Sequence, residues 1–170
     1  MTTLFTTIED LKLMGVAVIN GTGNALNNVI TGNLAANVLN GAGGNDTISG
    51  MGGNDTLTGG AGTDIFVFKT ALNATSNKDT ITDFTAVDDI MHLENTGTGL
   101  FNVLTAGALA AGNFVASATG AATTATQYIT YNTTSGALSY DADGNGAGVA
   151  IQFATLTGAP TITNADFLVI

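Results

Sequence analysis

The sequence predicts an all-β protein built as a parallel β-roll, followed by a β-rich C-terminal cap or sandwich region. A nine-residue period runs through residues 23–67. The chain holds 23 glycines and a single proline, which favours many turns with unusual backbone geometry. Aromatic residues make up only 6% of the chain and Trp is absent. This composition favours a repetitive core of small side chains over one large globular core.

The period divides into five nine-residue units that share three columns. The first column is glycine throughout: Gly23, Gly32, Gly41, Gly50 and Gly59. The sixth is Asn28, Asn37, Asp46, Asp55 and Asp64, and the eighth is Ile30, Leu39, Ile48, Leu57 and Phe66. Such a unit fits a six-residue turn and a three-residue strand whose one apolar side chain points inward. Two units then make a coil of 18 residues, so alternate units lie on the same side of the roll.

Units three to five resemble the GGxGxDxUx nonapeptide of the RTX family, the calcium-binding repeat of type I secreted bacterial proteins. In that family Ca²⁺ lies between turns on the same side of the roll. Carried over to this sequence, the resemblance implies carboxylate ligands at Asp46, Asp55 and Asp64. It implies carbonyl ligands at Ala42, Gly44, Met51, Gly53, Gly60 and Gly62. Two such turns would supply the hard oxygen ligands, about six to eight, that calcium prefers.

The position of each unit along the coil decides which acids share an ion. Asp46 and Asp64 lie two units apart and would share one. Asp55 lies on the other side, where its upstream partner Asn37 carries no charge, so a downstream partner must come from beyond the fifth unit. The first two units also carry Leu26 and Ala35 where the turn glycine belongs, and we expect them to stack without a strongly bound ion.

The charge balance excludes several kinds of partner. Thirteen acids face three lysines, for a net charge of −10, which argues against nucleic acid and anionic membranes. The acids gather between residues 46 and 94, where they repel one another unless a cation neutralises them. The absence of Cys excludes disulfides and thiolate metal sites. No apolar run reaches the roughly 18 residues that a membrane-spanning helix needs.

Residues 68–94 leave the repeat. They resemble the segment that follows the last RTX repeat in serralysin-type proteases, which packs over the open end of the roll and lends an acid to the final calcium site. Asp79 or Asp83 is the candidate for that carboxylate. His92 is the only histidine, and with no partner residue it is expected at the surface or half-buried rather than as a ligand.

Residues 95–170 alternate as strands do. Strands are expected at 127–132, 137–140 and 149–153. The string Asp141-Ala-Asp143-Gly-Asn145-Gly146 matches the first half of an EF-hand loop, but its twelfth position is Gln152 and strands flank it. An acidic hairpin turn is therefore favoured over a calcium site.

The expected division of the chain is a leading strand or cap at 1–22, the β-roll at 23–67, a roll-capping segment at 68–94 and the C-terminal region at 95–170. The last residues, Asn164–Ile170, resemble the uncleaved C-terminal signal of type I secretion, which implies a type I exporter as a transient partner. Residues Met1–Phe5 show no basic and apolar segments of a cleaved signal peptide.

No GxSxG, Cys nucleophile, histidine pair or P-loop is present, so a non-enzymatic role is expected. The sequence predicts a secreted or cell-surface calcium-binding module that folds when it binds calcium. The alternative is a calcium-dependent, self-assembling piece of an adhesin, surface layer or extracellular filament. A polysaccharide-binding module is less favoured, because three lysines and three tyrosines offer little basic or aromatic surface.

Overall fold

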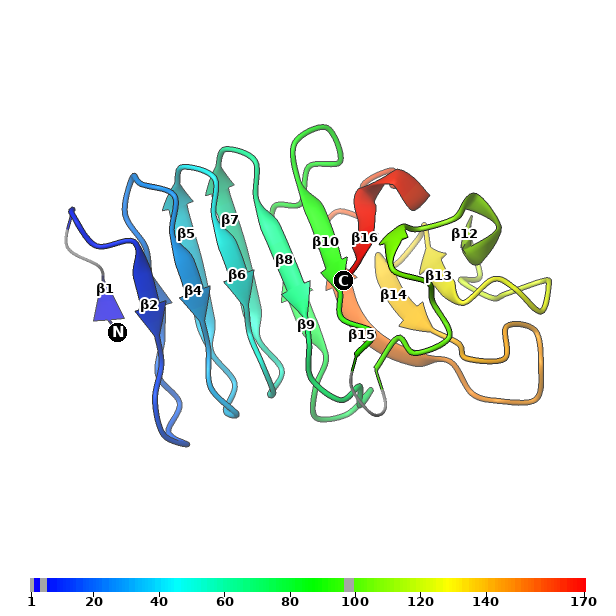
Figure 1. Cartoon of the computed structure of the whole chain (residues 1–170). Helices are drawn as coiled ribbons and strands as arrows, with labels where there is room; N and C mark the ends of the chain where they lie inside the picture. The colour runs from blue at the N-terminus through cyan, green and yellow to red at the C-terminus, as the bar shows by residue number, and fades with distance from the viewer. Residues whose placement is uncertain (1, 4–5, 97–99) are drawn as a thin grey trace.

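A computed structural model describes residues 2–3, 6–96 and 100–170, and the regular secondary structure in this part of the chain is almost wholly strands, arranged in two sheets (Figure 1). In spatial order the first sheet has nine strands, β1 (Thr2–Thr3), β3 (Gly21–Thr22), β5 (Val38–Gly43), β7 (Thr56–Ala61), β9 (Asp79–Ile81), β15 (Ile151–Leu156), β14 (Ala137–Tyr140), β13 (Ile129–Asn132) and β12 (Phe114–Ser117). The second has seven, β11 (Gly107–Ala108), β16 (Phe167–Val169), β10 (Ile90–Leu93), β8 (Ile65–Phe68), β6 (Thr47–Ser49), β4 (Val29–Thr31) and β2 (Asp10–Lys12). The all-β fold with a parallel roll is confirmed.

The 18-residue coil sets the register between neighbouring strands. Ile30 pairs with Ile48 between β4 and β6, and Leu39 pairs with Leu57 between β5 and β7, all in parallel. Successive units alternate between the two sheets, so the turns stack in two columns along the edges of the roll (Figure 1). This is the geometry that brings position six of alternate units together.

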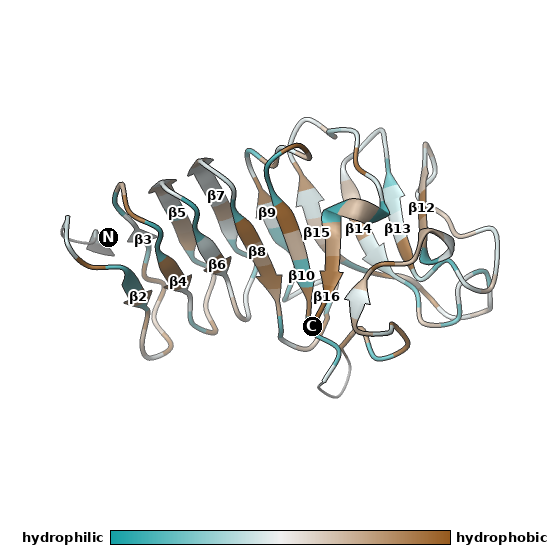
Figure 2. Cartoon of the chain, turned by 45° about the horizontal axis from the view of Figure 1, so that its top comes forward, coloured by the Kyte–Doolittle hydropathy of each residue, from teal (hydrophilic) through white to brown (hydrophobic). Residues whose placement is uncertain are grey.

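The core is one line of apolar side chains from each sheet. The five residues of the eighth column are at most 1% exposed: Ile30, Leu39, Ile48, Leu57 and Phe66. Partly buried positions alternate with buried ones along β8, a strand that is hydrophobic throughout (Figure 2). Each coil therefore buries only two apolar residues of the column, and neighbouring coils must stack to exclude water from them.

The stacking continues past the five units. β9 pairs in parallel with β7, and β10 pairs in parallel with β8, so that Ile81 follows Leu57 and Met91 follows Phe66. A longer connection at residues 69–78 precedes β9, and a turn at residues 82–89 precedes β10. Residues 68–94 thus add a further rung to each sheet, where the resemblance had implied a segment packed over the open end.

The C-terminal region extends both sheets. β13 and β14 are antiparallel and are joined by the expected turn at 133–136. β15 is antiparallel to β14 and pairs in parallel with β9 on its other side. β16 follows a short 3₁₀ helix, η2 (Asn164–Asp166), and lies parallel to β10. A second 3₁₀ helix, η1 (Ala111–Asn113), leads into β12. The hairpin that the alternating pattern predicted is confirmed.

Aromatic side chains fill the junction between the roll and this region. Phe153 packs edge-on against Phe68 and Phe101, with ring centroids 5.0 and 5.1 Å apart. Phe101 in turn packs against Tyr140 at 5.2 Å. The few large side chains of the chain thus gather where the small-residue core ends.

Candidate calcium-binding turns

The position-six side chains form a hydrogen-bonded ladder along each edge of the roll. On one edge the backbone N–H groups of Asn28, Asp46 and Asp64 donate to Oδ1 of the next position-six acid, at 2.7, 2.8 and 2.9 Å. The acceptors are Asp46, Asp64 and Asp89 in turn. The N–H of the preceding turn therefore fixes Oδ1 of each carboxylate. This leaves Oδ2 inside the turn to which the carboxylate belongs.

The other edge has the same ladder, one unit out of phase. The N–H of Asn37 donates to Asp55 Oδ1 at 2.7 Å, and the N–H of Asp55 donates to Asp79 Oδ1 at 3.1 Å. Asp79 therefore stands where the next position-six acid of this edge would be.

Two of these carboxylates have an oxygen without a partner. Asp46 Oδ2 and Asp55 Oδ2 are buried and accept no hydrogen bond from any residue that the structure describes. Asp46 is 0% exposed and Asp55 2%. A buried carboxylate oxygen that lacks a donor is strongly unfavourable. The chemistry of both turns therefore fits a cation beside Oδ2.

In the turns that end in Asp46, Asp55 and Asp64, the position-six carboxylate, and not the backbone conformation, explains why the first column is glycine. A Cβ on Gly41 would collide with Asp46 Oδ2 and with the carbonyl of Gly59 in the next turn. Gly50 and Gly59 meet Asp55 and Asp64 in the same way. The carboxylate folds back over the first residue of its own turn, so only hydrogen fits there.

The six residues implied as carbonyl ligands share one backbone property. All have positive φ: Ala42 (81°), Gly44 (101°), Met51 (71°), Gly53 (114°), Gly60 (105°) and Gly62 (137°). In these turns every second residue is left-handed, which is unfavourable for Ala and Met and free for Gly. A Cβ on Gly60 or Gly62 would strike the carbonyl oxygen of Ala42 or Gly44. These carbonyls therefore face the next turn on the same edge.

Backbone oxygens would supply much of a coordination shell. Within the described ranges, no three acidic or histidine side chains are placed to hold one metal ion together. A cation at these turns would combine at most a pair of carboxylates with the carbonyls, a donor set that suits calcium. The Met51 carbonyl already accepts a hydrogen bond from the Thr70 hydroxyl.

Burial raises the pKa of the turn carboxylates. The pKa of Asp46 rises to about 6 because burial disfavours its charged form, although the hydrogen bond from Asn28 opposes the rise. Burial raises the pKa of Asp55 and Asp79 as well, that of Asp79 the more, and the charge of Asp55 adds to the effect on Asp79. Without a cation these turns hold protons more tightly than an exposed Asp does.

Asp79 and Asp83, the two candidates from the segment after the repeats, lie in different places. Asp79 continues the ladder below Asp55. Asp83 accepts hydrogen bonds from the N–H groups of Gly59 and Gly60, both at 2.9 Å, and so fixes the start of the fifth turn.

Asp89 was not among the residues that the sequence pointed to, yet it ends the ladder below Asp64. Its Oδ1 accepts from Asp64 N–H at 2.9 Å and its Oδ2 from Thr85 N–H at 2.8 Å. The two-residue spacing between columns six and eight could have located Asp89 from the sequence. Asp89 precedes Met91 by two residues, as Asp64 precedes Phe66.

The acidic turn at Asp141–Gly146 joins β14 to β15. Asp143 Oδ2 accepts from Gly148 N–H at 2.9 Å, within the same connection between the two strands. Hydrogen bonds within that connection hold this carboxylate, in contrast to the partnerless oxygens of Asp46 and Asp55.

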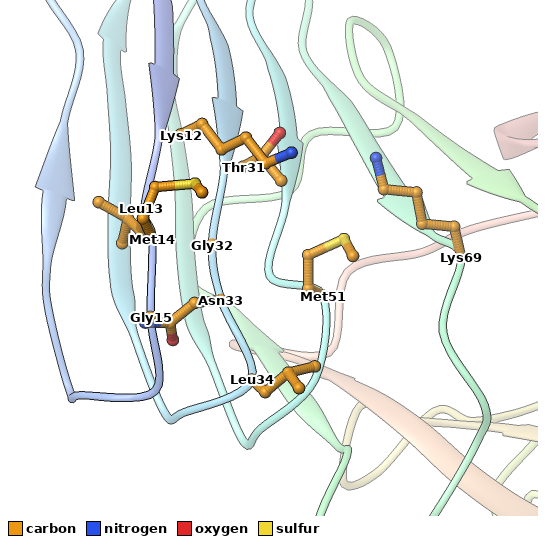
Figure 3. Close-up of a pocket in the computed structure, with 10 residues that line it drawn as sticks. All are labelled: Lys12, Leu13, Met14, Gly15, Thr31, Gly32, Asn33, Leu34, Met51 and Lys69. Atoms are coloured by element: carbon orange, nitrogen blue, oxygen red, sulfur yellow. The ribbon is translucent and has the colours of Figure 1, made fainter.

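Neither His92 nor the groove beside Lys12 resembles a metal site. His92 is half-buried on β10, and burial lowers the pKa of its imidazole. A groove of about 310 Å³ is bordered by Lys12 and Lys69, with Met51 between them (Figure 3). Two cations at its border make it unsuitable for a further cation.

Comparison with known families agrees with the turn geometry. A family model described as RTX calcium-binding nonapeptide repeat (4 copies) matches residues 22–54 and 40–68. Residues 22–68 are RTX repeats. The RTX nonapeptide is a calcium-binding motif, so calcium is the ion of these turns. No protein in the curated set matches the chain.

Among solved structures, the chain is similar to the solution structure of the AlgE6R3 subunit from the Azotobacter vinelandii mannuronan C5-epimerase. The TM-score is 0.60 at 19% identity, over 97% of this chain and 86% of that one. At this identity the likeness concerns the fold. No helix in the described part of the chain is long and apolar enough to cross a membrane.

Proposed function

We propose that this chain is a secreted, non-catalytic calcium-binding module that folds on binding calcium and carries a type I secretion signal at its C-terminus. The observation that carries the folding part is the pair of buried, partnerless oxygens, Asp46 Oδ2 and Asp55 Oδ2. A fold that buries unpaired carboxylates is incomplete without a cation, so the ion acts as part of the core.

The proposed ligands follow the two edges of the roll. On the first edge, Asp46 and Asp64 hold one ion with the carbonyls of Ala42, Gly44, Gly60 and Gly62. On the second edge, Asp55 and Asp79 hold another with the carbonyls of Met51 and Gly53. Asp83 contributes by holding the fifth turn in place through Gly59 and Gly60.

Folding is coupled to calcium by mass action. Without the ion, acids clustered along the two edges repel one another, and each coil buries too little apolar surface to offset the repulsion. Calcium binds only the folded turns and stabilises them, by about 2.7 kcal/mol when the ion stands at about 100 times its Kd. A chain that is unfolded at low calcium and folded at high calcium suits export followed by folding outside the cell.

The proposed secretion signal, Asn164–Ile170, supplies η2 and β16 to the folded roll. β16 can pair with β10 only after β10 is formed, so the signal is free for an exporter while the chain is unfolded. Deleting residues 164–170 should abolish export by a cell that carries a type I exporter, whereas deleting residues 2–7 should not. Equal export of both variants would contradict this part of the proposal.

Far-UV circular dichroism during calcium titration tests the coupling. We expect a coil spectrum in chelator and a β spectrum in millimolar-range calcium, with magnesium as the control ion. A β spectrum that does not change on chelation would contradict the proposal.

Calcium-dependent self-assembly is a second candidate, and the N-terminal end of the roll favours it. Large apolar side chains are exposed there: Ile8, Met14, Val16, Val18, Val29, Leu34 and Val38. β1 and β2 are edge strands, and this end carries only Glu9, Asp10 and Lys12 as charges before residue 46. Light scattering in calcium tests it. Assembly that Val16→Thr and Val18→Thr abolish would support this candidate, and a strict monomer would exclude it.

A further inference from the structure

The first two turns of the repeat, residues 23–28 and 32–37, form a second type of turn. Each carries Asn at position two as well as at position six, in the pattern G-N-x-x-x-N. The position-two residues are Asn24 and Asn33, and the position-six residues are Asn28 and Asn37. We call these the amide turns, and the turns that end in Asp46, Asp55 and Asp64 the aspartate turns.

In the first amide turn both ends of the buried side chain are satisfied. Asn28 is 1% exposed. Its Oδ1 accepts from Asn24 N–H at 2.8 Å. Its Nδ2 donates to the carbonyl of Ile8, in the preceding turn, and to Asn24 Oδ1, both at 3.3 Å. The amide therefore links its own turn to the one before it.

The second amide turn, on the other edge, repeats the arrangement. Asn37 Oδ1 accepts from Asn33 N–H at 2.9 Å. Its Nδ2 donates to the carbonyl of Ile19 at 2.8 Å and to Asn33 Oδ1 at 3.2 Å. Two independent turns thus use the same set of contacts.

The aspartate turns differ from the amide turns at the side-chain oxygen that lies over the first glycine of the turn. Asn28 Oδ1 lies over Gly23 and accepts the N–H of Asn24, whereas the partnerless Asp46 Oδ2 lies over Gly41. Asn37 and Asp55 differ in the same way on the other edge.

The NH₂ group of each Asn faces the preceding turn, as Oδ1 of each Asp does. The amide oxygen has a donor within its own turn and the NH₂ group has two acceptors, whereas the carboxylate Oδ2 has no donor and needs a positive charge beside it. The backbones differ as well. Ala42 and Gly44 have positive φ, and their counterparts Asn24 and Leu26 do not.

We infer that the amide turns are calcium-free turns. In them the position-two N–H satisfies the side-chain oxygen that has no donor in the aspartate turns, and the side-chain NH₂ of Asn28 or Asn37 bonds the preceding turn. They end the calcium ladder on the N-terminal side and keep the first coils stacked without adding negative charge. The inference rests on the proposed function, because it takes the aspartate turns as the calcium sites.

The first test compares ion number with stability in saturating calcium. Asn28→Ala removes the amide and should lower Tm by about 3–8 °C while the number of bound ions stays that of the wild type. Asp46→Asn, the matched change in an aspartate turn, should lose at least one ion. Calorimetry or native mass spectrometry measures the number of calcium ions that each variant binds. A loss of bound calcium in Asn28→Ala would overturn the inference.

The second test converts one type of turn into the other. The triple variant N24A/L26G/N28D turns GNALNN into GAAGND, with small residues, a turn glycine and the acid in the places that unit three uses. It should bind one more ion than the wild type. A folded triple variant with the wild-type ion number would overturn the inference, and this variant decides alone if Asn28→Ala does not fold. A wild-type chain that binds no calcium would instead defeat the proposed function.

Discussion

At the scale of single residues, the turn is defined by one close approach. The position-six side chain folds back over the first residue of its own turn, and Gly41 lies against Asp46 Oδ2. The residues in columns one and six of the repeat therefore depend on each other. A substitution in one of these columns changes the packing of the residue in the other.

This approach predicts different effects for two glycines of one turn. Gly41→Ala should destabilise the calcium-bound fold by about 2 kcal/mol or more, because its Cβ collides with Asp46 and with backbone. Gly43→Ala is the matched control. Its nearest neighbour would be the Ala61 carbonyl at 3.9 Å, so its effect should stay within about 0.5 kcal/mol. Denaturant unfolding in calcium measures both, and equal effects would contradict the packing described.

Aspartates of the roll and of the C-terminal hairpin should differ in their effect on the calcium midpoint of folding. Replacing both Asp46 and Asp64 by Ala should raise the calcium midpoint of folding by at least about tenfold, which corresponds to about 1.4 kcal/mol. Asp141→Ala should leave the midpoint nearly unchanged, because that residue belongs to the hairpin turn between β14 and β15. A larger response from Asp141→Ala would move the calcium site to that hairpin.

At the scale of elements, one carboxylate at each step ties the rungs from β4 to β10 in one sheet and from β5 to β9 in the other. β8 and β10 pair over four residues, and Asp89 adds a side-chain bond to the turn of Asp64 and another to Thr85. The ladder therefore ends on a residue that is satisfied from both sides.

Asp89 and its neighbour Asp88 offer a matched pair for this rung. Asp89→Ala should destabilise the fold by about 1–3 kcal/mol, because it leaves the buried N–H of Asp64 without an acceptor. Asp88 is exposed, and Asp88→Ala should have an effect within about 0.5 kcal/mol. Thermal unfolding in saturating calcium distinguishes the two, and similar losses would argue against a role for Asp89 in the ladder.

At the scale of the whole molecule, protons and calcium compete for the same buried acids. The pKa of Asp46 is raised by burial to about 6, and those of Asp55 and Asp79 are raised as well. The ion-free fold binds more protons than the unfolded chain, so this contribution to stability is present below about pH 4 and is lost as the pH rises through about 6.

In calcium-free buffer we therefore expect more β structure at about pH 5 than at about pH 7.5, measured by circular dichroism. Calcium affinity should change in the opposite direction and increase with pH, because the ion needs the carboxylates deprotonated. The variant Asp46→Asn should show a weaker pH response. An ion-free β signal that grows with pH would contradict the assignment of these carboxylates as buried.

The sequence by itself determined the roll, its period and the inward column. Glycine at position one, an acid or amide at position six and an apolar residue at position eight each follow from a local requirement that repeats every nine residues. The same regularity located the aspartate turns and set the two Asn units apart.

Only the tertiary structure decided how the ladders end. Asp79 and Asp89 lie 24 and 25 residues beyond the acids that they follow, so the longer connections before them hide the period. The contacts of Asn28 and Asn37 also join residues of neighbouring turns, such as Ile8 and Ile19. Local sequence determines the shape of one turn, but the partner of a buried polar atom depends on which segments the stacked coils bring together.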